Sequence, residues 1–183
     1  MIFDKLNVDK TWTLFLDRDG VINKHLPDDY VKTWDEFVFN ERVFETLKKL
    51  SELVGRILIV TNQQGIGKGL MTEEDLMNIH TKMLHEIKAN GGRIDAVFHA
   101  PHKVADDSYG LRKPNTGMAL KAKQLFPEID FSKSIMVGDT ASDMQFGKNA
   151  GMKTVFVNKS LVHQNLNYDI IDFEISALSE LIS

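Results

Sequence analysis

The chain has 183 residues, of which 43% are hydrophobic and 26% charged, and its formal net charge is -4. Size and composition predict one domain over residues 1–183 with a sizeable core. A basic run with interleaved aromatic residues is absent, which argues against nucleic acid as a partner. Apolar stretches are too short to span a membrane and the N-terminus lacks a signal-peptide core, so we expect no membrane partner and a cytoplasmic location. The lack of cysteine excludes disulfides and thiolate metal sites.

Short apolar runs alternate with amphipathic segments along the chain. After a lead-in over 1–11, strands are predicted over 13–16, 56–60, 94–99, 134–137 and 154–157, with one more short strand in the C-terminal tail. Helices are predicted over 41–53, 72–90 and 114–126 and near 176–182, and a further helix follows Asp143 and ends at 150. We expect Asn40 to cap the first helix, and Thr72 with Asp75 to form a capping box on the second. This alternation predicts an α/β fold, a parallel sheet with helices on both faces.

Polar side chains follow three of the predicted strands at the point where each strand ends. They are Asp17 and Asp19, then Thr61, then Asp139 and Asp143, and a loop adds Lys113. Any one of these is more often a turn, cap or solvated residue than a catalytic one. Ligands of open α/β sheets bind at the carboxyl ends of the strands, however, so the set together predicts an active site.

Phosphoryl transfer is the chemistry that suits this set. The Asp17 carboxylate is ionised at neutral pH and needs no base to act as a nucleophile. A phosphate monoester is also anionic, and two unit charges about 4 Å apart repel by roughly 4 kcal/mol at an effective dielectric constant near 20. Mg²⁺ bound by Asp17 and Asp139 would reverse that sign, while Lys113 and the Thr61 hydroxyl hold the remaining phosphoryl oxygens.

Asp19 needs a protonation state different from that of Asp17. The leaving alkoxide requires a proton, so Asp19 must be protonated when the bond breaks, and we expect neighbouring carboxylates to raise its pKa. Metal ligation by its side chain would lower that pKa, so only its backbone carbonyl is expected on the metal. In a second step Asp19 then accepts a proton from the water that hydrolyses the aspartyl-phosphate.

The same residues carry a family resemblance. The segment 17–21 (Asp-Arg-Asp-Gly-Val), Thr61 after a strand, Lys113 before a proline, and Gly138-Asp139 with Asp143 resemble, in order, the four motifs of the haloacid dehalogenase (HAD) superfamily of phosphatases. The resemblance implies a Rossmann-like fold and an Mg²⁺-dependent enzyme. It implies Asp17 as nucleophile and Asp19 as general acid/base. It also implies that Thr61 and Lys113 stabilise the phosphoryl group. The implied Mg²⁺ ligands are Asp17, the Asp19 carbonyl and Asp139. The implied role of Asp143 is to orient a metal-bound water or Lys113.

A narrower resemblance is to the histidinol-phosphatase and heptose-bisphosphate phosphatase subfamily. It rests on Ile22-Asn23 after the first motif, on the glycine-rich segment 61–69, on Thr72-Glu73, and on Arg112-Lys113-Pro114. Ile22-Asn23 and the loop 65–69 favour the D-glycero-D-manno-heptose 1,7-bisphosphate branch, with histidinol phosphate as the alternative substrate. The resemblance implies Arg112 for a second, non-transferred phosphate, and Asn23, Asn62, Gln63 and the loop 27–30 around the sugar.

One departure from the subfamily concerns a zinc loop that usually precedes Arg-Lys-Pro. The matching positions here hold Ala100, His102, Tyr109 and Leu111, so a single ligand remains. One ligand does not make a tetrahedral site, and we expect no zinc. The loop 100–111 is then expected to be held by packing, for which Tyr109 and Leu111 are candidates.

The spacing of the motifs leaves no room for a separate cap domain. A loop and one helix fill the gap from Asp19 to Thr61, and a helix, a strand and a loop fill the gap from Thr61 to Lys113. An open site for a small-molecule phosphate, in a monomer, is the expectation. Two other classes stay open: a receiver-like phospho-acceptor and a binding protein of the same fold. A phosphate-loop kinase does not fit, because Gly69 stands where Ser or Thr is required after Lys68.

Overall fold

The computed structural model describes residues 1–26, 29–108, 110–158 and 167–182. Six strands form one parallel sheet in the order β3-β2-β1-β4-β5-β6. The strands are β1 (Thr13–Leu16), β2 (Arg56–Asn62), β3 (Ala96–Ala100), β4 (Ser134–Gly138), β5 (Lys153–Val157) and β6 (Phe173–Ile175). This strand order is that of a doubly wound Rossmann-like sheet, which confirms the predicted fold class.

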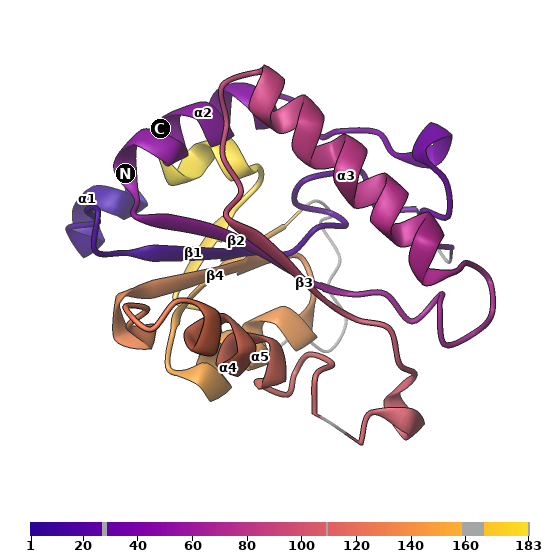
Figure 1. Cartoon of the computed structure of the whole chain (residues 1–183). Coiled ribbons are helices and arrows are strands. Elements are labelled where there is room, and N and C mark those ends of the chain that lie inside the picture. Colours follow the sequence, from indigo (N-terminus) through magenta and orange to yellow (C-terminus); the bar gives the residue numbers. More distant parts are fainter. Residues whose placement is uncertain (27–28, 109, 159–166, 183) are drawn as a thin grey trace.

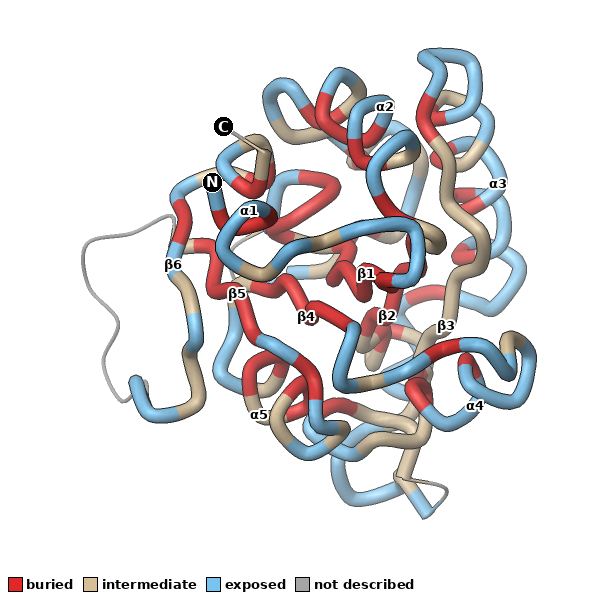
Figure 2. Tube along the Cα trace, turned by 90° about the vertical axis from the view of Figure 1, so that its left-hand side faces the viewer, coloured by how far each residue is buried: buried red, intermediate tan, exposed pale blue. Residues whose placement is uncertain are grey.

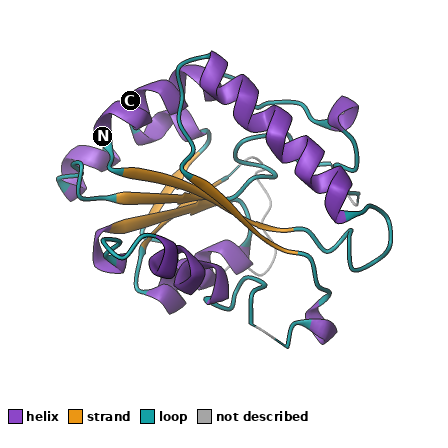
Figure 3. Cartoon of the chain, in the orientation of Figure 1, coloured by secondary structure: helices purple, strands orange, loops and turns teal. Residues whose placement is uncertain are grey.

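Helices cover both faces of the sheet. They are α1 (Ile2–Leu6), α2 (Val43–Leu53), α3 (Glu73–Ala89), α4 (Gly117–Leu125) and α5 (Ala141–Ala150). In Figure 1, α2 and α3 lie on one face while α4 and α5 lie on the other, and Figure 3 shows the strands as the layer between them. Within the described residues, no helix is long and apolar enough to cross a membrane.

The core has two parts because side chains of a strand alternate between the two faces. Leu14 and Leu16 of β1 join the cluster under α2 and α3, whereas Phe15 joins the cluster under α4 and α5. All three are fully buried, and burial of such a side chain stabilises the fold by about 1.5–3 kcal/mol. In Figure 2, β1 and β4 are accordingly buried along their whole length, and the exposed residues lie on the helices and loops around the sheet.

The register of the central strands aligns the ends that carry the polar residues. Leu16, the last residue of β1, lies beside Ile59 of β2 on one side and Val137 of β4 on the other. The N–H of Asp17 continues this pairing and donates to the Val137 carbonyl at 2.9 Å. Residues that follow the three strands therefore meet at one edge of the sheet.

Three local features differ from the sequence-based expectations or refine them. The lead-in contains the short helix α1, and the C-terminal helix is the 3-10 segment η5 (Leu178–Leu181). The prediction of Asn40 as a helix cap is wrong: α2 begins after Arg42, which has a φ of 58°. The Asn40 amide donates instead to the carbonyls of the turn 20–23, where it bridges the turn after β1. The Thr72–Asp75 capping box is confirmed.

Candidate active site

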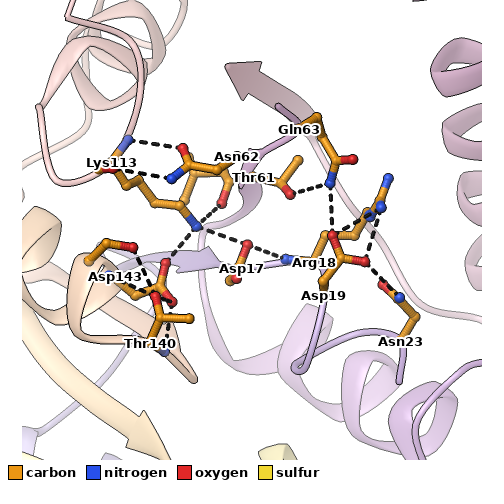
Figure 4. A network of polar contacts seen from close by, with 12 residues as sticks. Asp17, Arg18, Asp19, Asn23, Thr61, Asn62, Gln63, Lys113, Thr140 and Asp143 are labelled. Atoms are coloured by element: carbon orange, nitrogen blue, oxygen red, sulfur yellow. Dashed lines mark hydrogen bonds and ion pairs between the residues drawn. The ribbon is translucent and has the colours of Figure 1, made fainter. Parts of the chain in front are cut away.

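Lys113 lies at the centre of the first half of the site. Its ammonium contacts Asp17 Oδ1 at 2.9 Å and Asp143 Oδ1 at 2.5 Å, and it donates to the Val60 carbonyl at 2.8 Å. All three side chains are buried, with Lys113 2% exposed and Asp143 fully enclosed. Figure 4 shows the Lys113 amine between the two carboxylates. The sequence-predicted residues from β1, the loop before α4 and the start of α5 are thus in direct contact.

The protonation states of this half reflect an excess of negative charge. Burial raises the pKa of Asp17 well above its usual range, and the carboxylates of Asp143 and Asp139 raise it further against the opposing effect of Lys113. Although burial lowers the pKa of Lys113, the negative charges of Asp143 and Asp17 outweigh it, so that pKa is raised and the ammonium stays charged. The Asp17 half therefore favours an additional positive charge.

A divalent metal ion fits this half on the chemistry of its donors. Asp17, Asp139 and Asp143 each offer one carboxylate oxygen, and these three atoms lie within 4.8 Å of one another. The set contains oxygen donors alone, which is what Mg²⁺ prefers. Of the residues that the structure describes, no other group of three His, Asp or Glu side chains meets this condition.

Two glycines allow the acidic residues to come this close. Gly20 has a φ of 86°, and a Cβ on it would lie 1.8 Å from Asp139 Oδ2. A Cβ on Gly138 would lie 2.3 Å from the Asp143 Cβ. Any larger residue at either position would therefore displace an acidic side chain, so both glycines of the motifs are required by packing.

Asp143 also belongs to the capping box that begins α5. Its Oδ2 accepts from the Thr140 hydroxyl at 2.6 Å and from the Thr140 N–H at 3.0 Å. The cap fixes the carboxylate, and Oδ1 then faces Lys113. The structure thus places Asp143 against Lys113, which is one of the two roles that the resemblance implied.

Asp19 lies in a second half of the site with different neighbours. Both of its carboxylate oxygens accept from Arg18 Nη2 at 3.0 Å, Oδ1 accepts from Asn23 at 2.9 Å, and Oδ2 accepts from Gln63 at 2.8 Å. Burial raises the pKa of Asp19, but the Arg18 guanidinium and these hydrogen bonds outweigh burial and lower it. The expectation of a raised pKa is wrong for this arrangement, because the Arg18 charge and the hydrogen bonds from Arg18, Asn23 and Gln63 outweigh the effect of burial.

Arg18 and His80 are the residues that the sequence analysis missed. The Arg18 side chain is fully buried, and its Nη1 lies 3.2 Å from Nε2 of His80 on α3. Burial and the charge of Arg18 lower the pKa of His80 to about 3, so the neutral ring accepts this hydrogen bond. Strand alternation is the signal that was available, since Arg18 is in phase with Leu14 and Leu16 and so faces α3.

The remaining predicted residues support the motif residues. Thr61 is buried at the end of β2, and its hydroxyl accepts from Gln63 at 2.9 Å. Asn62 is bound to the backbone of Lys113, accepting from its N–H at 2.9 Å and donating to its carbonyl at 3.1 Å. Asn23 and Gln63, predicted to bind substrate, are almost fully buried against Asp19.

A cavity of about 1290 Å³ opens beside Asp139 and Gly20 and extends over the ends of β5 and β6. Lys24 and His25, which follow the Asn23 position, line it. Of the predicted loop 27–30, residues 27–28 lie outside the described part. Its Tyr30 hydroxyl accepts hydrogen bonds from Gln64 and Lys68 of the glycine-rich loop.

Comparison with known proteins places this geometry in a family. A family model described as polynucleotide kinase 3 phosphatase matches residues 8–172. A D-glycero-alpha-D-manno-heptose-1,7-bisphosphate 7-phosphatase of Mycobacterium bovis is 40% identical over 138 residues, which cover 75% of this chain and 72% of that protein. A protein of the same name from Campylobacter jejuni is 39% identical over 148 residues, 81% of this chain and 83% of the relative.

Solved structures agree with these relatives. The crystal structure of D,D-heptose 1,7-bisphosphate phosphatase from B. bronchiseptica, complexed with magnesium and phosphate, has a TM-score of 0.81 and 29% identity and covers 92% of this chain and 94% of its own. The corresponding enzyme from Burkholderia thailandensis has a TM-score of 0.61 and 27% identity, with 92% and 94% covered. The chain belongs to the polynucleotide kinase 3 phosphatase family within the HAD superfamily, and it is a phosphatase.

Proposed function

We propose that this phosphatase removes the 7-phosphate of D-glycero-D-manno-heptose 1,7-bisphosphate, with Asp17 as its nucleophile. The observation that carries the chemistry is the contact of Lys113 with both Asp17 and Asp143, beside Asp139, at the carboxyl ends of β1, β2 and β4. The substrate is supported by relatives at 40% and 39% identity that bear this activity in their names.

In the first step an Asp17 oxygen attacks the phosphorus, and the bond from phosphorus to the sugar oxygen breaks. The sugar alkoxide takes a proton from Asp19, and the phosphoryl group stays on Asp17. Lys113 holds Asp17 in place through Oδ1, and together with the Thr61 hydroxyl it would bind phosphoryl oxygens. Asp17, Asp139 and the Asp19 carbonyl would hold Mg²⁺, whose charge would offset the negative charge that the carboxylates and the phosphate share.

In the second step water attacks the phosphorus, gives a proton to Asp19, and breaks the bond to Asp17. The lowered pKa of Asp19 suits this base role, because its carboxylate is ionised and held by Arg18. For the first step Asp19 must gain a proton, and the negative charge of the incoming phosphate raises its pKa in that direction. Arg18, Asn23 and Gln63 keep the carboxylate oriented through both steps.

The remaining proposals concern the chain as a whole. The presence of one sheet supports a single phosphatase domain over 1–183. We propose that its site is open and that Arg112 binds the second phosphate there. We further propose that the protein is a monomer and that it is located in the cytoplasm. Light scattering during size exclusion tests the first, and fractionation of cells tests the second.

A kinetic comparison of four substrates tests the proposed activity. Heptose 1,7-bisphosphate should have the highest kcat/KM, followed by histidinol phosphate and p-nitrophenyl phosphate, with phosphate release that requires Mg²⁺. A 3′-phosphorylated oligonucleotide serves as the fourth, because the family description names that class, and it should be a poor substrate for a chain with a net charge of -4. Higher kcat/KM on histidinol phosphate or the oligonucleotide would replace the proposed substrate.

The variant Asp17→Asn is the control for the chemistry. It keeps the size of the side chain but removes the nucleophilic charge, so activity on every substrate should fall by at least about a thousandfold. Normal turnover by this variant would contradict the assignment of Asp17.

A further inference from the structure

Three consecutive backbone N–H groups before α4 are bound by side chains instead of by a helix or strand. The N–H of Leu111 donates to Asp107 Oδ1 and that of Arg112 to Asp107 Oδ2, both at 2.9 Å. The N–H of Lys113 donates to Asn62 Oδ1 at 2.9 Å. The backbone that leads into the catalytic lysine is therefore fixed from two sides.

Asp107 makes further contacts within the same loop. Its Oδ2 also accepts from the Asn115 amide at 3.3 Å, and its carbonyl accepts from the Gly110 N–H at 3.3 Å. The chain contains no cysteine, so thiolate–metal ligation does not anchor this loop. A carboxylate that accepts two backbone N–H groups is a strong local alternative, since hydrogen bonds to a charged acceptor are stronger than neutral ones.

These contacts fix the backbone of two cationic residues, Arg112 and Lys113. The Lys113 ammonium already has three partners, namely Asp17, Asp143 and the Val60 carbonyl. Arg112 differs, because its Nη1 is buried and has no hydrogen-bond partner within the described part of the chain. A buried cationic donor without an acceptor is costly, so the guanidinium suits an incoming anion.

We propose that Asp107 is a positioning residue, which orients Arg112 toward the non-transferred phosphate of a sugar bisphosphate. It acts on the backbone of 111–112, while Asn62 fixes the next residue independently. The proposal rests on the proposed function for the identity of the anion. Asp107 then affects the binding of a bisphosphate but has little effect on a substrate with one phosphate, which does not use Arg112.

Steady-state kinetics of Asp107→Ala on heptose 1,7-bisphosphate and on p-nitrophenyl phosphate test this. We expect KM for the bisphosphate to rise about tenfold with kcat little changed, and kcat/KM for the aryl phosphate to stay within about twofold. Asp107→Asn retains one acceptor oxygen, so its KM for the bisphosphate should lie between those of the wild type and Asp107→Ala. The matched control is Asp106→Ala, which removes the exposed neighbouring carboxylate and should change neither substrate.

A double-variant cycle with Arg112→Ala separates positioning from general support of the loop. If Asp107 acts through Arg112, Asp107→Ala should add no further loss in the Arg112→Ala background. An equal loss in both backgrounds, or an equal loss on the aryl phosphate, would overturn the proposal and leave Asp107 with a structural role alone.

Hydrogen exchange gives a readout that does not depend on the substrate. The amides of Leu111 and Arg112 should exchange faster in Asp107→Ala, while that of Lys113, held by Asn62, should not. Unchanged exchange at both amides overturns the proposal. If the wild type shows no preference for the bisphosphate, the proposed substrate is wrong, and so is the link to a second phosphate. The exchange result then decides separately whether Asp107 holds the backbone.

Discussion

Asp17 and Asp19 are one residue apart, yet their carboxylates lie in opposite electrostatic surroundings. Asp17 lies beside Asp139 and Asp143, and burial, followed by the charges of these two carboxylates, raises the pKa of Asp17 against the opposing effect of Lys113. Asp19 is surrounded by the Arg18 guanidinium and two amides, and its pKa is lowered. Figure 4 shows the two groups on either side of Arg18 N–H, which itself donates to Asp17.

The difference shows how one strand end can serve two tasks. The Asp17 half has more negative than positive groups, which is the condition for holding a cation and through it an anionic substrate. In the Asp19 half, protein groups already bind and orient the carboxylate, which suits the proposed role of Asp19 in proton transfer. Variants that change the charge of one half alone can test whether the two are separate.

The largest expected effect comes from removing the cation of the Asp17 half. Lys113→Met should lower activity by about 10²–10³-fold, because the ammonium contacts Asp17 and, in the proposed mechanism, binds the phosphoryl group. It should also destabilise the fold by about 3 kcal/mol or more, since it leaves buried carboxylates unpaired. Kinetics and urea unfolding measure the two effects.

Lys121→Met, at an exposed position of α4, is the matched control and should be neutral. Activity near the wild-type value in Lys113→Met would contradict a central role for this contact.

The next largest effect is expected on Mg²⁺ affinity, which should depend on the Asp17 half and not on the side chain of Asp19. Asp139→Asn removes one of the clustered carboxylates and should weaken Mg²⁺ binding by more than about tenfold, the lower end of what even outer-shell partners contribute. Asp19→Asn should leave the affinity for Mg²⁺ nearly unchanged, because that side chain is bound to Arg18, Asn23 and Gln63. Calorimetric titration without substrate makes the comparison, and equal losses in both variants would show that the halves are not separate.

The last expected effect concerns the pH dependence of stability on the Asp19 side. The pKa of His80 is about 3 in the folded chain, against an ordinary value of 6.5. Above pH 6.5 both folded and unfolded chains hold it neutral; between pH 6.5 and 3 only the unfolded chain binds the proton. As the pH is lowered through that window, the free energy of unfolding should therefore fall by up to about 1.4 kcal/mol per pH unit.

His80→Gln retains an acceptor for Arg18 and does not titrate, so urea unfolding of this variant from pH 7 to pH 4 isolates the effect. Its stability should fall less steeply than that of the wild type. Parallel curves would mean that His80 is not held neutral by the fold.

Sequence reasoning located the strand ends well, because apolar runs stop where polar residues begin. The bounds of β1 agree with the prediction, and Asp17 and Asp139 directly follow strands that were expected. The strand β2 runs to Asn62, two residues beyond its predicted end, so Thr61 lies within it. Their order along the chain carried the family resemblance. The Thr72 capping box was equally readable, since it needs only residues three apart.

Contacts between distant segments were not readable in the same way. The role of Asn40 was misassigned, because its amide binds a turn some twenty residues earlier in the chain. The lowered pKa of Asp19 depends on the Arg18 guanidinium and on hydrogen bonds from Asn23 and Gln63, and Gln63 lies 44 residues later in the chain. The Asp107 contacts are local, but the side chain gives no signal that distinguishes it from other acidic loop residues.

The central claim is that the phosphoryl group passes through Asp17 while Asp19 acts on protons. Substrate labelled with ³²P at the transferred phosphate, mixed with Asp19→Ala and quenched in acid within one turnover, tests it directly, because loss of the base slows hydrolysis of the intermediate. Reduction of the quenched protein with tritiated borohydride releases the phosphate from the acyl phosphate and leaves tritium in its place, and peptide mapping should find that tritium at position 17. Label on another residue, or no covalent label in a variant that still releases the sugar, would contradict the account.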